Sequence, residues 1–261
     1  LDAKDFIVIL GTRISDHHDL SSVFEYLREG TVVFIDEVHA LRKKMQETLY
    51  PILEDGTLEI SYGSRTKAQR KLPPFTLIGA TTEPGTLARP LADRFGMEFQ
   101  LDPYNDEESK QIATRSLDMM EIMPVIGFTG EMELDPLKLI CQAARNNPRR
   151  INNMLLTCRD YMEDEQQKQL DPLTVLEVLD DLGFTEGGIS KIERSILDIL
   201  SNTYHGNPVG IETLLVAVAT DKKTITEVCE PMLVGKGLIE KTAKGRVVTT
   251  AGAAYIKKHG V

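Results

Sequence analysis

The sequence predicts an α/β fold with a parallel sheet, followed by a helical domain and a small C-terminal domain. Two apolar runs rich in β-branched residues, TVVFI at 31–35 and FTLIGA at 75–80, are typical of strands buried on both faces of a parallel sheet. Between them, residues 41–53 have helical spacing and residues 56–71 are expected to form a hairpin. A strand, a helix and a second strand in this order indicate an α/β layer.

A helical domain is predicted from residue 106 to residue 181, where β-branched runs disappear and helical patterns follow one another. The glycine-rich segment GFTEGG at 183–188 is the candidate linker that ends this domain.

The C-terminal domain has the pattern of a winged helix. Two capping boxes, Ser190 with Glu193 and Thr224 with Glu227, precede apolar residues at helical spacing, and a further apolar helix face begins at Ile211. Two short strands are expected at 238–242 and 246–250, joined by a turn at 243–245. Three helices followed by a two-stranded wing make a winged-helix module.

The composition excludes several classes of protein. The 261 residues are 41% hydrophobic and 27% charged, as in soluble globular proteins. No apolar run reaches the roughly 18 residues that a membrane span requires, and no signal peptide opens the chain. Three cysteines, far apart and odd in number, exclude a disulfide framework and a CxxC metal site. We therefore expect a cytoplasmic protein with no membrane partner.

Charge is unevenly distributed along the chain. The 30 Lys and Arg against 40 Asp and Glu give a net charge of −10, which taken alone argues against a nucleic-acid binder. Residues 185–261, however, hold 10 Lys and Arg against 8 Asp and Glu. Any contact with nucleic acid is therefore expected in this tail.

The segment VVFIDEVH at 32–39 carries the clearest candidate chemistry. An apolar strand ends there in two adjacent carboxylates, Asp36 and Glu37. Ligands of open α/β sheets bind at the carboxyl ends of the strands. In nucleotide hydrolases the Asp of such a pair helps to hold Mg²⁺ and the Glu polarises the attacking water. Taken alone, the pair is equally compatible with a solvated acidic turn.

Three further segments carry weaker indications. Thr82 follows the second predicted strand, where a hydroxyl could sense a γ-phosphate; a plain Thr turn is the commoner explanation. Arg94, in the segment Asp-Arg-Phe-Gly, could act as an arginine finger in a neighbouring subunit, although such residues are more often surface arginines. Arg149, in Asn-Pro-Arg-Arg, could face a phosphate from a helix start, or could simply begin a helix.

The order and spacing of these segments are those of AAA+ motors, and the chain resembles the RuvB family of bacterial motors that migrate Holliday junctions. The resemblance covers almost the whole chain, and LPPFTLIGATT followed by DRFG is highly specific. It rests on six segments: FIDEVHAL (34–41), LYPILEDG (49–56), LPPFTLIGATT (72–82), LADRFG (91–96), NPVGIETL (207–214) and KGRVVTT (244–250).

The resemblance implies an organisation and an activity. Residues 1–101 would be the remainder of an AAA+ P-loop NTPase core, from the Walker B strand to the arginine finger. Residues 102–184 would be the helical lid and residues 185–261 the winged-helix DNA-binding domain. The activity implied is ATP-driven translocation of duplex DNA, which migrates four-way junctions in recombination and repair. ATP and Mg²⁺ are the implied cofactors, a homo-oligomeric ring (a hexamer) the implied assembly, and a RuvA-like protein at the hairpin 56–71 the implied partner.

The resemblance also implies residue roles. The implied catalytic residues are Asp36, which organises Mg²⁺, Glu37 as the base, Thr82 as the sensor and Arg94 as the finger. The implied ATP-binding residues are Glu54, Asp55, Tyr104 and Arg149. The implied DNA-binding residues are Lys241, Lys244 and Arg246.

The chain departs from the family in ways that bear on activity. It contains no GxxxxGK[ST] segment, so it lacks the backbone cradle and the Lys that hold phosphates. The 261 residues are therefore not expected to hydrolyse ATP. The family carries this loop upstream of the position matching Leu1, where we expect a further segment. The alternative is a degenerate member of the family that never had the loop. Glu83 and Ala92 stand where the family usually has Arg, and the lid is longer within 119–134. The polar hairpin tip at 63–67 leaves the identity of the hairpin's partner open.

Two other hypotheses remain. The chain could be a non-catalytic AAA+ or clamp-loader-like DNA-binding scaffold, or a winged-helix regulator with an inactive ATPase-like body. The joint presence of Asp36, Glu37, Arg94 and Arg149 favours the motor.

Overall fold

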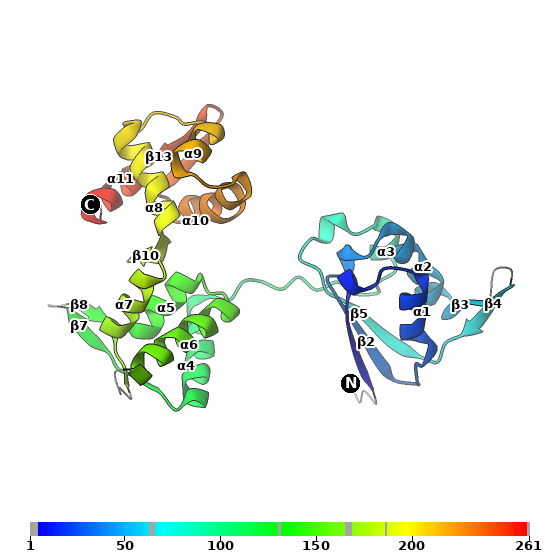
Figure 1. Ribbon diagram of the computed structural model, residues 1–261. Coiled ribbons are helices and arrows are strands. Elements are labelled where there is room, and N and C mark those ends of the chain that lie inside the picture. The colour runs from blue at the N-terminus through cyan, green and yellow to red at the C-terminus, as the bar shows by residue number, and fades with distance from the viewer. Residues whose placement is uncertain (1–4, 63–65, 130–131, 165–168, 186, 260–261) are drawn as a thin grey trace. The chain divides into compact units, whose positions relative to one another are not determined.

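The computed structural model describes residues 5–62, 66–129, 132–164, 169–185 and 187–259. The chain divides into two compact units, Leu1–Leu101 and Asp102–Val261 (Figure 1). Each unit is considered by itself below. None of the described helices is long and apolar enough to cross a membrane.

The first unit is built on a parallel sheet of three strands in the order β1-β2-β5. Within it, Val33 pairs with Ile7 on one side and with Leu77 on the other. The elements of this unit are β1 (Phe6–Leu10), α1 (His17–Glu25), β2 (Thr31–Asp36), α2 (Lys43–Glu54), β3 (Thr57–Tyr62), β4 (Thr66–Lys71), β5 (Phe75–Gly79) and α3 (Arg89–Ala92), with short 3₁₀ turns at Gly11–Arg13, Val38–Ala40 and Pro84–Thr86.

Helices α1 and α2 cover one face of this sheet (Figure 1). The core beneath them includes Leu20 and Phe24 of α1, Ile35 of β2 and Leu49 of α2, all fully buried. On the strands at the edges, alternate residues stay exposed, among them Val8 of β1 at 61%. The expectation that both apolar runs are buried on two faces therefore holds for β2 and is wrong for β5, because Thr76 and Ile78 of β5 are exposed while Phe75 and Leu77 pack on the core.

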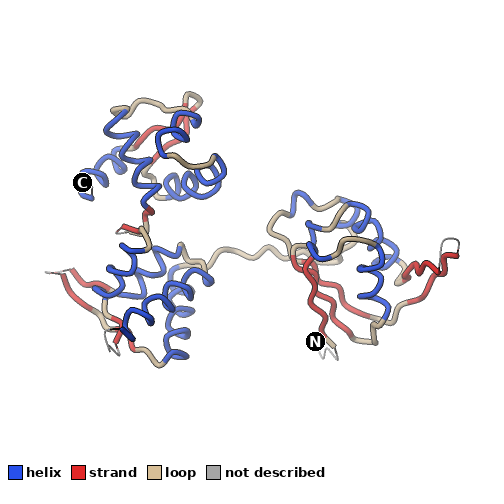
Figure 2. Tube along the Cα trace, in the orientation of Figure 1, coloured by secondary structure: helices blue, strands red, loops and turns tan. Residues whose placement is uncertain are grey.

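Strand β1 and helix α1 were not predicted, although local signals for both exist. Phe6–Leu10 is an apolar run with three β-branched residues in a row. Asp16 caps α1 by accepting hydrogen bonds from the backbone N–H groups of His18 and Asp19, and Asp19 completes a capping box. The predicted helix at 41–53 and the predicted hairpin at 56–71 are confirmed as α2 and as the antiparallel pair β3–β4. This hairpin projects from the end of α2 (Figure 2); residues 63–65 of its predicted tip lie outside the described residues.

In the described residues of the helical part of the second unit, the helices pack around a shared apolar core. The stretch at 119–134, where we expected a longer lid, contains short strands: β6 pairs in parallel with β9, and β7 pairs with β8. The elements are α4 (Asp106–Met120), β6 (Met123–Pro124), β7 (Gly127–Thr129), β8 (Met132–Leu134), α5 (Pro136–Ala144), α6 (Pro148–Asp164), β9 (Gln169–Leu170) and α7 (Pro172–Asp181).

The glycine-rich segment at 183–188 is more tightly held than a linker. Strand β10 (Phe184–Thr185) pairs with β11 (Ile189–Ser190). Gly188 has φ +74°, and a Cβ there would come within 2.5 Å of the Gln142 carbonyl oxygen. Only glycine fits such an approach, so the backbone of this segment packs directly on the end of α5.

The C-terminal part is the predicted winged helix, with its own apolar core. Its elements are α8 (Lys191–Asp198), a π-helical turn at Ile199–Thr203, α9 (Ile211–Val218), a π-helical turn at Thr224–Cys229, α10 (Glu230–Gly235), β12 (Ile239–Thr242), β13 (Gly245–Val248) and α11 (Thr250–His259). The capping box at Ser190 is confirmed. The one predicted at Thr224 is wrong, because Thr224 donates instead to Asp221, which accepts from both its backbone N–H and its hydroxyl. Helix α11 was not predicted.

Candidate functional site

The carboxyl ends of β2 and β5 meet at one place in the first unit. The backbone N–H of Ala80 donates to the Ile35 carbonyl at 2.9 Å, and that of Val38 donates to the Ala80 carbonyl at 2.9 Å. These two bonds extend the parallel ladder past the ends of both strands. Asp36 and Glu37 are thereby placed beside Thr82, as expected for neighbouring strands of one sheet.

Glu37 sits on a backbone that few residues adopt. Its φ of +50° and ψ of 51° are left-handed, which is uncommon for a residue with a side chain. Gly11, just after β1, lies against this turn: a Cβ on Gly11 would be 2.4 Å from the Glu37 carbonyl oxygen. Any other residue at position 11 would displace the turn, so Gly11 contributes to the site although it has no side chain.

The carboxylate of Glu37 is held by three polar groups of two residues, Thr82 and His39. Thr82 approaches it with its hydroxyl at 3.2 Å and its backbone N–H at 3.4 Å. The His39 Nδ1 lies 3.2 Å from Glu37 Oε2 and 2.8 Å from the Thr81 hydroxyl. The Glu37 side chain remains 36% exposed. The carboxylate is therefore oriented in advance and still accessible to water, as a general base requires.

Asp36 is the candidate Mg²⁺ residue. It is half-buried at the end of β2, and its Oδ1 accepts the Glu37 backbone N–H at 3.1 Å. One carboxylate completed by substrate phosphates and water is the usual protein contribution to a Mg²⁺ site, so this residue fits. No cluster of three or more His, Cys, Asp or Glu side chains suited to a metal occurs in the described parts of the chain.

Arg94 and Glu54, predicted for different roles, lie together. Arg94 Nη2 donates to Glu54 Oε1 at 2.9 Å, and its Nη1 donates to the Pro90 carbonyl at 2.5 Å. The guanidinium also lies over the ring of Tyr50, 4.5 Å from its centroid. Tyr50 was not predicted as a site residue.

The remaining predicted nucleotide residues are exposed. Asp55 ends α2, and Tyr104, 48% exposed, lies in the segment before α4. Arg149 is in the first turn of α6. Tyr104 and Arg149 belong to the second unit, so their roles toward nucleotide stay predictions.

The three predicted DNA-binding residues differ in accessibility. Lys244 is exposed in the wing turn, and Lys241 on β12 is mostly exposed, with its Nζ 3.5 Å from Glu230 Oε2. Arg246 is only 8% exposed, and its Nε donates to Glu230 Oε1 at 2.5 Å. The guanidinium of Arg246 is thus largely buried against the carboxylate of Glu230, and its predicted contact with DNA stays a prediction.

An ion pair that was not predicted joins the helical part to the winged helix. Arg145, at the end of α5, donates from Nη2 to Glu193 Oε1 of α8 at 2.5 Å and from Nη1 to the Val228 carbonyl at 3.3 Å. Glu193 is fully buried and also accepts the Ser190 backbone N–H.

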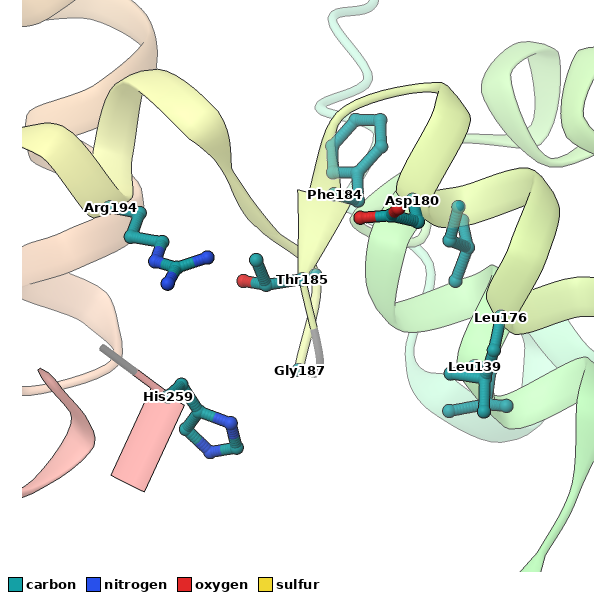
Figure 3. Close-up of a pocket in the computed structure, with 10 residues that line it drawn as sticks. Leu139, Leu176, Asp180, Phe184, Thr185, Gly187, Arg194 and His259 are labelled. Atoms are coloured by element: carbon teal, nitrogen blue, oxygen red, sulfur yellow. The ribbon is translucent and has the colours of Figure 1, made fainter. Parts of the chain in front are cut away.

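Beside this junction lies a cavity of about 280 Å³ (Figure 3). In it the Arg194 side chain is directed toward Thr185, with His259 nearby (Figure 3). The two parts of the second unit thus meet through a buried ion pair beside an open cavity.

The geometry defines a class of protein. A parallel sheet whose central strand ends in an oriented Asp-Glu pair beside a Thr-tipped strand is the Walker B side of an AAA+ P-loop ATPase, here joined to a winged helix. The profile of the Holliday junction DNA helicase RuvB P-loop domain matches residues 4–101, and that of the RuvB C-terminal winged helix domain matches residues 186–257. The chain belongs to the RuvB family, which confirms the resemblance seen in its sequence.

Relatives of known identity are similar to this chain in sequence and in structure over most of its length. A Holliday junction branch migration complex subunit RuvB of Fusobacterium nucleatum is 39% identical over 243 residues, which are 92% of this chain and 71% of the relative. The RuvB of Corynebacterium aurimucosum is 35% identical over 91% of this chain and 64% of its own length. The Thermotoga maritima RuvB branch migration motor superposes with a TM-score of 0.72 at 30% identity, covering 97% of this chain and 78% of the other. A proline-to-glycine variant of the same Thermotoga protein gives 0.73 at 29% identity, covering 97% of this chain and 79% of that one.

Proposed function

We propose that this protein is an ATP-driven DNA motor of the RuvB type, which moves duplex DNA and thereby migrates four-way junctions. Two matched relatives are named as subunits of a Holliday junction branch migration complex. The observation that carries the proposal is the Glu37 carboxylate, held by Thr82 and His39 at the carboxyl end of the sheet. A non-catalytic scaffold would not require an oriented base on a left-handed backbone turn.

The proposed mechanism assigns one task to each residue. Glu37 accepts a proton from the attacking water, and Thr82 holds both the base and the water in line. Asp36 would hold Mg²⁺, and that ion would supply neutralisation of the charge that develops on the phosphates. Arg94 reaches the nucleotide of the neighbouring subunit in a homo-oligomeric ring, expected to be a hexamer. A finger of this kind contributes about 10³–10⁵ in kcat.

The remaining assignments complete the proposal. Residues 1–101 form the remainder of the ATPase core, 102–184 the lid and 185–261 the DNA-binding domain. Glu54, Asp55, Tyr104 and Arg149 are proposed at nucleotide, with Arg149 coupling it to the lid. The hairpin 56–71 is the proposed contact for a RuvA-like partner. Lys241 and Lys244 are proposed to contact DNA phosphates. Arg246 is proposed to stabilise the wing through its buried ion pair with Glu230.

ATP turnover further requires the phosphate-binding loop, which the 261 residues do not contain. The proposal is therefore tested on the full-length protein with a phosphate-binding loop in place. Glu37→Gln keeps the size of the side chain and removes the charge that polarises water. We expect it to bind ATP and to lower turnover by about 10²–10⁴. Turnover within a few-fold of the parent would show that Glu37 is not the base. A parent protein that binds DNA but never hydrolyses ATP would favour the scaffold.

A further inference from the structure

The arginine finger of this chain lies on a support made by its own α2 and α3. Gln46 of α2 is buried; it donates to the Leu41 carbonyl at 2.9 Å and accepts the Ala88 backbone N–H at 3.0 Å. Ala88 immediately precedes α3, whose Leu91 is fully buried. These contacts fix the start of α3 against α2, so the residues that follow α3 keep a constant distance from the end of α2.

Three groups then hold the guanidinium of Arg94 from different directions. The Tyr50 ring lies under it at 4.5 Å, Glu54 Oε1 accepts from Nη2 at 2.9 Å, and the Pro90 carbonyl accepts from Nη1 at 2.5 Å. A cation over an aromatic face and a charge-assisted hydrogen bond are both directional contacts. The Arg94 side chain remains 24% exposed.

A guanidinium carries five N–H donors, two on each Nη. Glu54 and Pro90 each use one of them, so Nη1 and Nη2 each keep a second N–H. Arg94 can therefore stay on its support and still donate to a phosphate from both Nη atoms.

We propose that Tyr50 and Glu54 are positioning residues for the arginine finger, so that Glu54 acts on the neighbouring subunit's nucleotide through Arg94 and not on the nucleotide of its own subunit. The inference rests on the proposed function and changes one part of it, the place where Glu54 works. Asp55, one residue further on, has no part in this support.

The first test measures the kinetics of ATP hydrolysis by rings of the full-length protein. Glu54→Gln keeps the shape of the side chain and loses the charge that fixes Nη2. A small misplacement of a catalytic group can cost about 10²-fold in rate, so we expect kcat to fall by roughly 10–100-fold with the KM for ATP unchanged within about twofold. Tyr50→Leu should act in the same direction, and Tyr50→Phe, which keeps the aromatic face, should restore most of the rate. Glu47→Gln removes an equal charge from an exposed site on the same helix and should leave kcat unchanged.

Mixed rings decide in which subunit Glu54 works. Glu54→Gln subunits keep an intact base, and Glu37→Gln subunits keep an intact finger and its support. If Glu54 serves the finger, mixing these two restores activity, whereas mixing Glu54→Gln with Arg94→Ala does not, because every finger is then impaired. The opposite pattern would place Glu54 at its own subunit's nucleotide and overturn the inference.

A measurement that needs no ATPase separates this inference from the proposed function. In the 261-residue chain, ¹⁵N NMR of the Arg94 guanidinium should show slow rotation about its terminal C–N bonds, and Glu54→Gln should speed it. Fast rotation in the parent chain would refute the inference that Tyr50 and Glu54 position Arg94, even if the ring hydrolyses ATP. Slow rotation of the guanidinium in a protein without ATPase activity would support the positioning role of Tyr50 and Glu54. The same result would contradict the proposal that the protein is an ATP-driven motor.

Discussion

Replacing Arg145 by alanine is the substitution whose cost the structure defines most directly. Arg145 donates to Glu193 at 2.5 Å and to the Val228 carbonyl at 3.3 Å. Glu193 is fully buried, so after Arg145→Ala its charge would lie in the interior with only the Ser190 backbone N–H as a partner.

The expected magnitude follows from the burial. Removing one partner of a buried ion pair costs about 3–5 kcal/mol, because the other charge stays unpaired away from water. Ser190→Ala is the matched control: it removes the hydroxyl that accepts the Glu193 backbone N–H at 3.3 Å and leaves the ion pair intact. The loss of a capping residue of this kind costs about 1 kcal/mol. The two variants should therefore differ by at least about 2 kcal/mol.

Hydrogen exchange of the 261-residue chain reports this difference locally. A loss of about 3 kcal/mol corresponds to roughly 10²-fold faster exchange, at about tenfold per 1.4 kcal/mol. We expect this acceleration for the amides of α8 and of the end of α5, while β2 and β5 in the other unit keep their rates. Glu193→Gln combined with Arg145→Ala should cost less than the sum of the two single changes, because they share one interaction. If Arg145→Ala exchanges no faster than Ser190→Ala, the ion pair does not join the two parts and the reasoning fails.

Three further outcomes are expected. The 261-residue chain should show no steady ATP turnover and at most weak ATP binding in calorimetric titration; low-micromolar affinity would contradict the role given to the missing loop. Replacing Lys241 and Lys244 together by alanine should weaken duplex binding equally on any sequence and lower the salt slope by about 2, whereas Lys138→Ala in the lid should not; an unchanged slope would move the DNA contact elsewhere. Burial raises the pKa of all three thiols, so iodoacetamide should not label them in the folded chain at about pH 8. Because folding favours the protonated thiols, their contribution to stability is present below pH 9.0 and is lost as the pH rises through the folded pKa values. Labelling at the rate of a free thiol would refute the raised pKa values. The folded pKa values are about 11 for Cys141, about 12 for Cys158 and about 11 for Cys229.

Parts of the candidate site could be predicted from sequence because each part lies within its own short segment. The β-branched runs of β2 and β5, the Asp36-Glu37 pair after one and Thr82 after the other are all local patterns. The parallel pairing then follows from the order of the elements, since the carboxyl ends of neighbouring parallel strands meet at one edge. His39 and Thr81 stand in the same two segments and were missed, because nothing in their spacing shows that one imidazole contacts both Glu37 and Thr81.

Hydrophobic periodicity and capping act between residues a few positions apart, so the class of fold, the order of its parts, the winged helix and the place of the acidic pair could be predicted from sequence. Which charges meet depends on the packing of segments that are distant in the sequence. Three arginine–glutamate pairs join residues that are distant in the sequence. They are Arg94 with Glu54, 40 positions apart, Arg145 with Glu193, 48 positions apart, and Arg246 with Glu230, 16 positions apart. The physical reason is that an ion pair depends on distance and burial in space, and the packing of whole helices sets both.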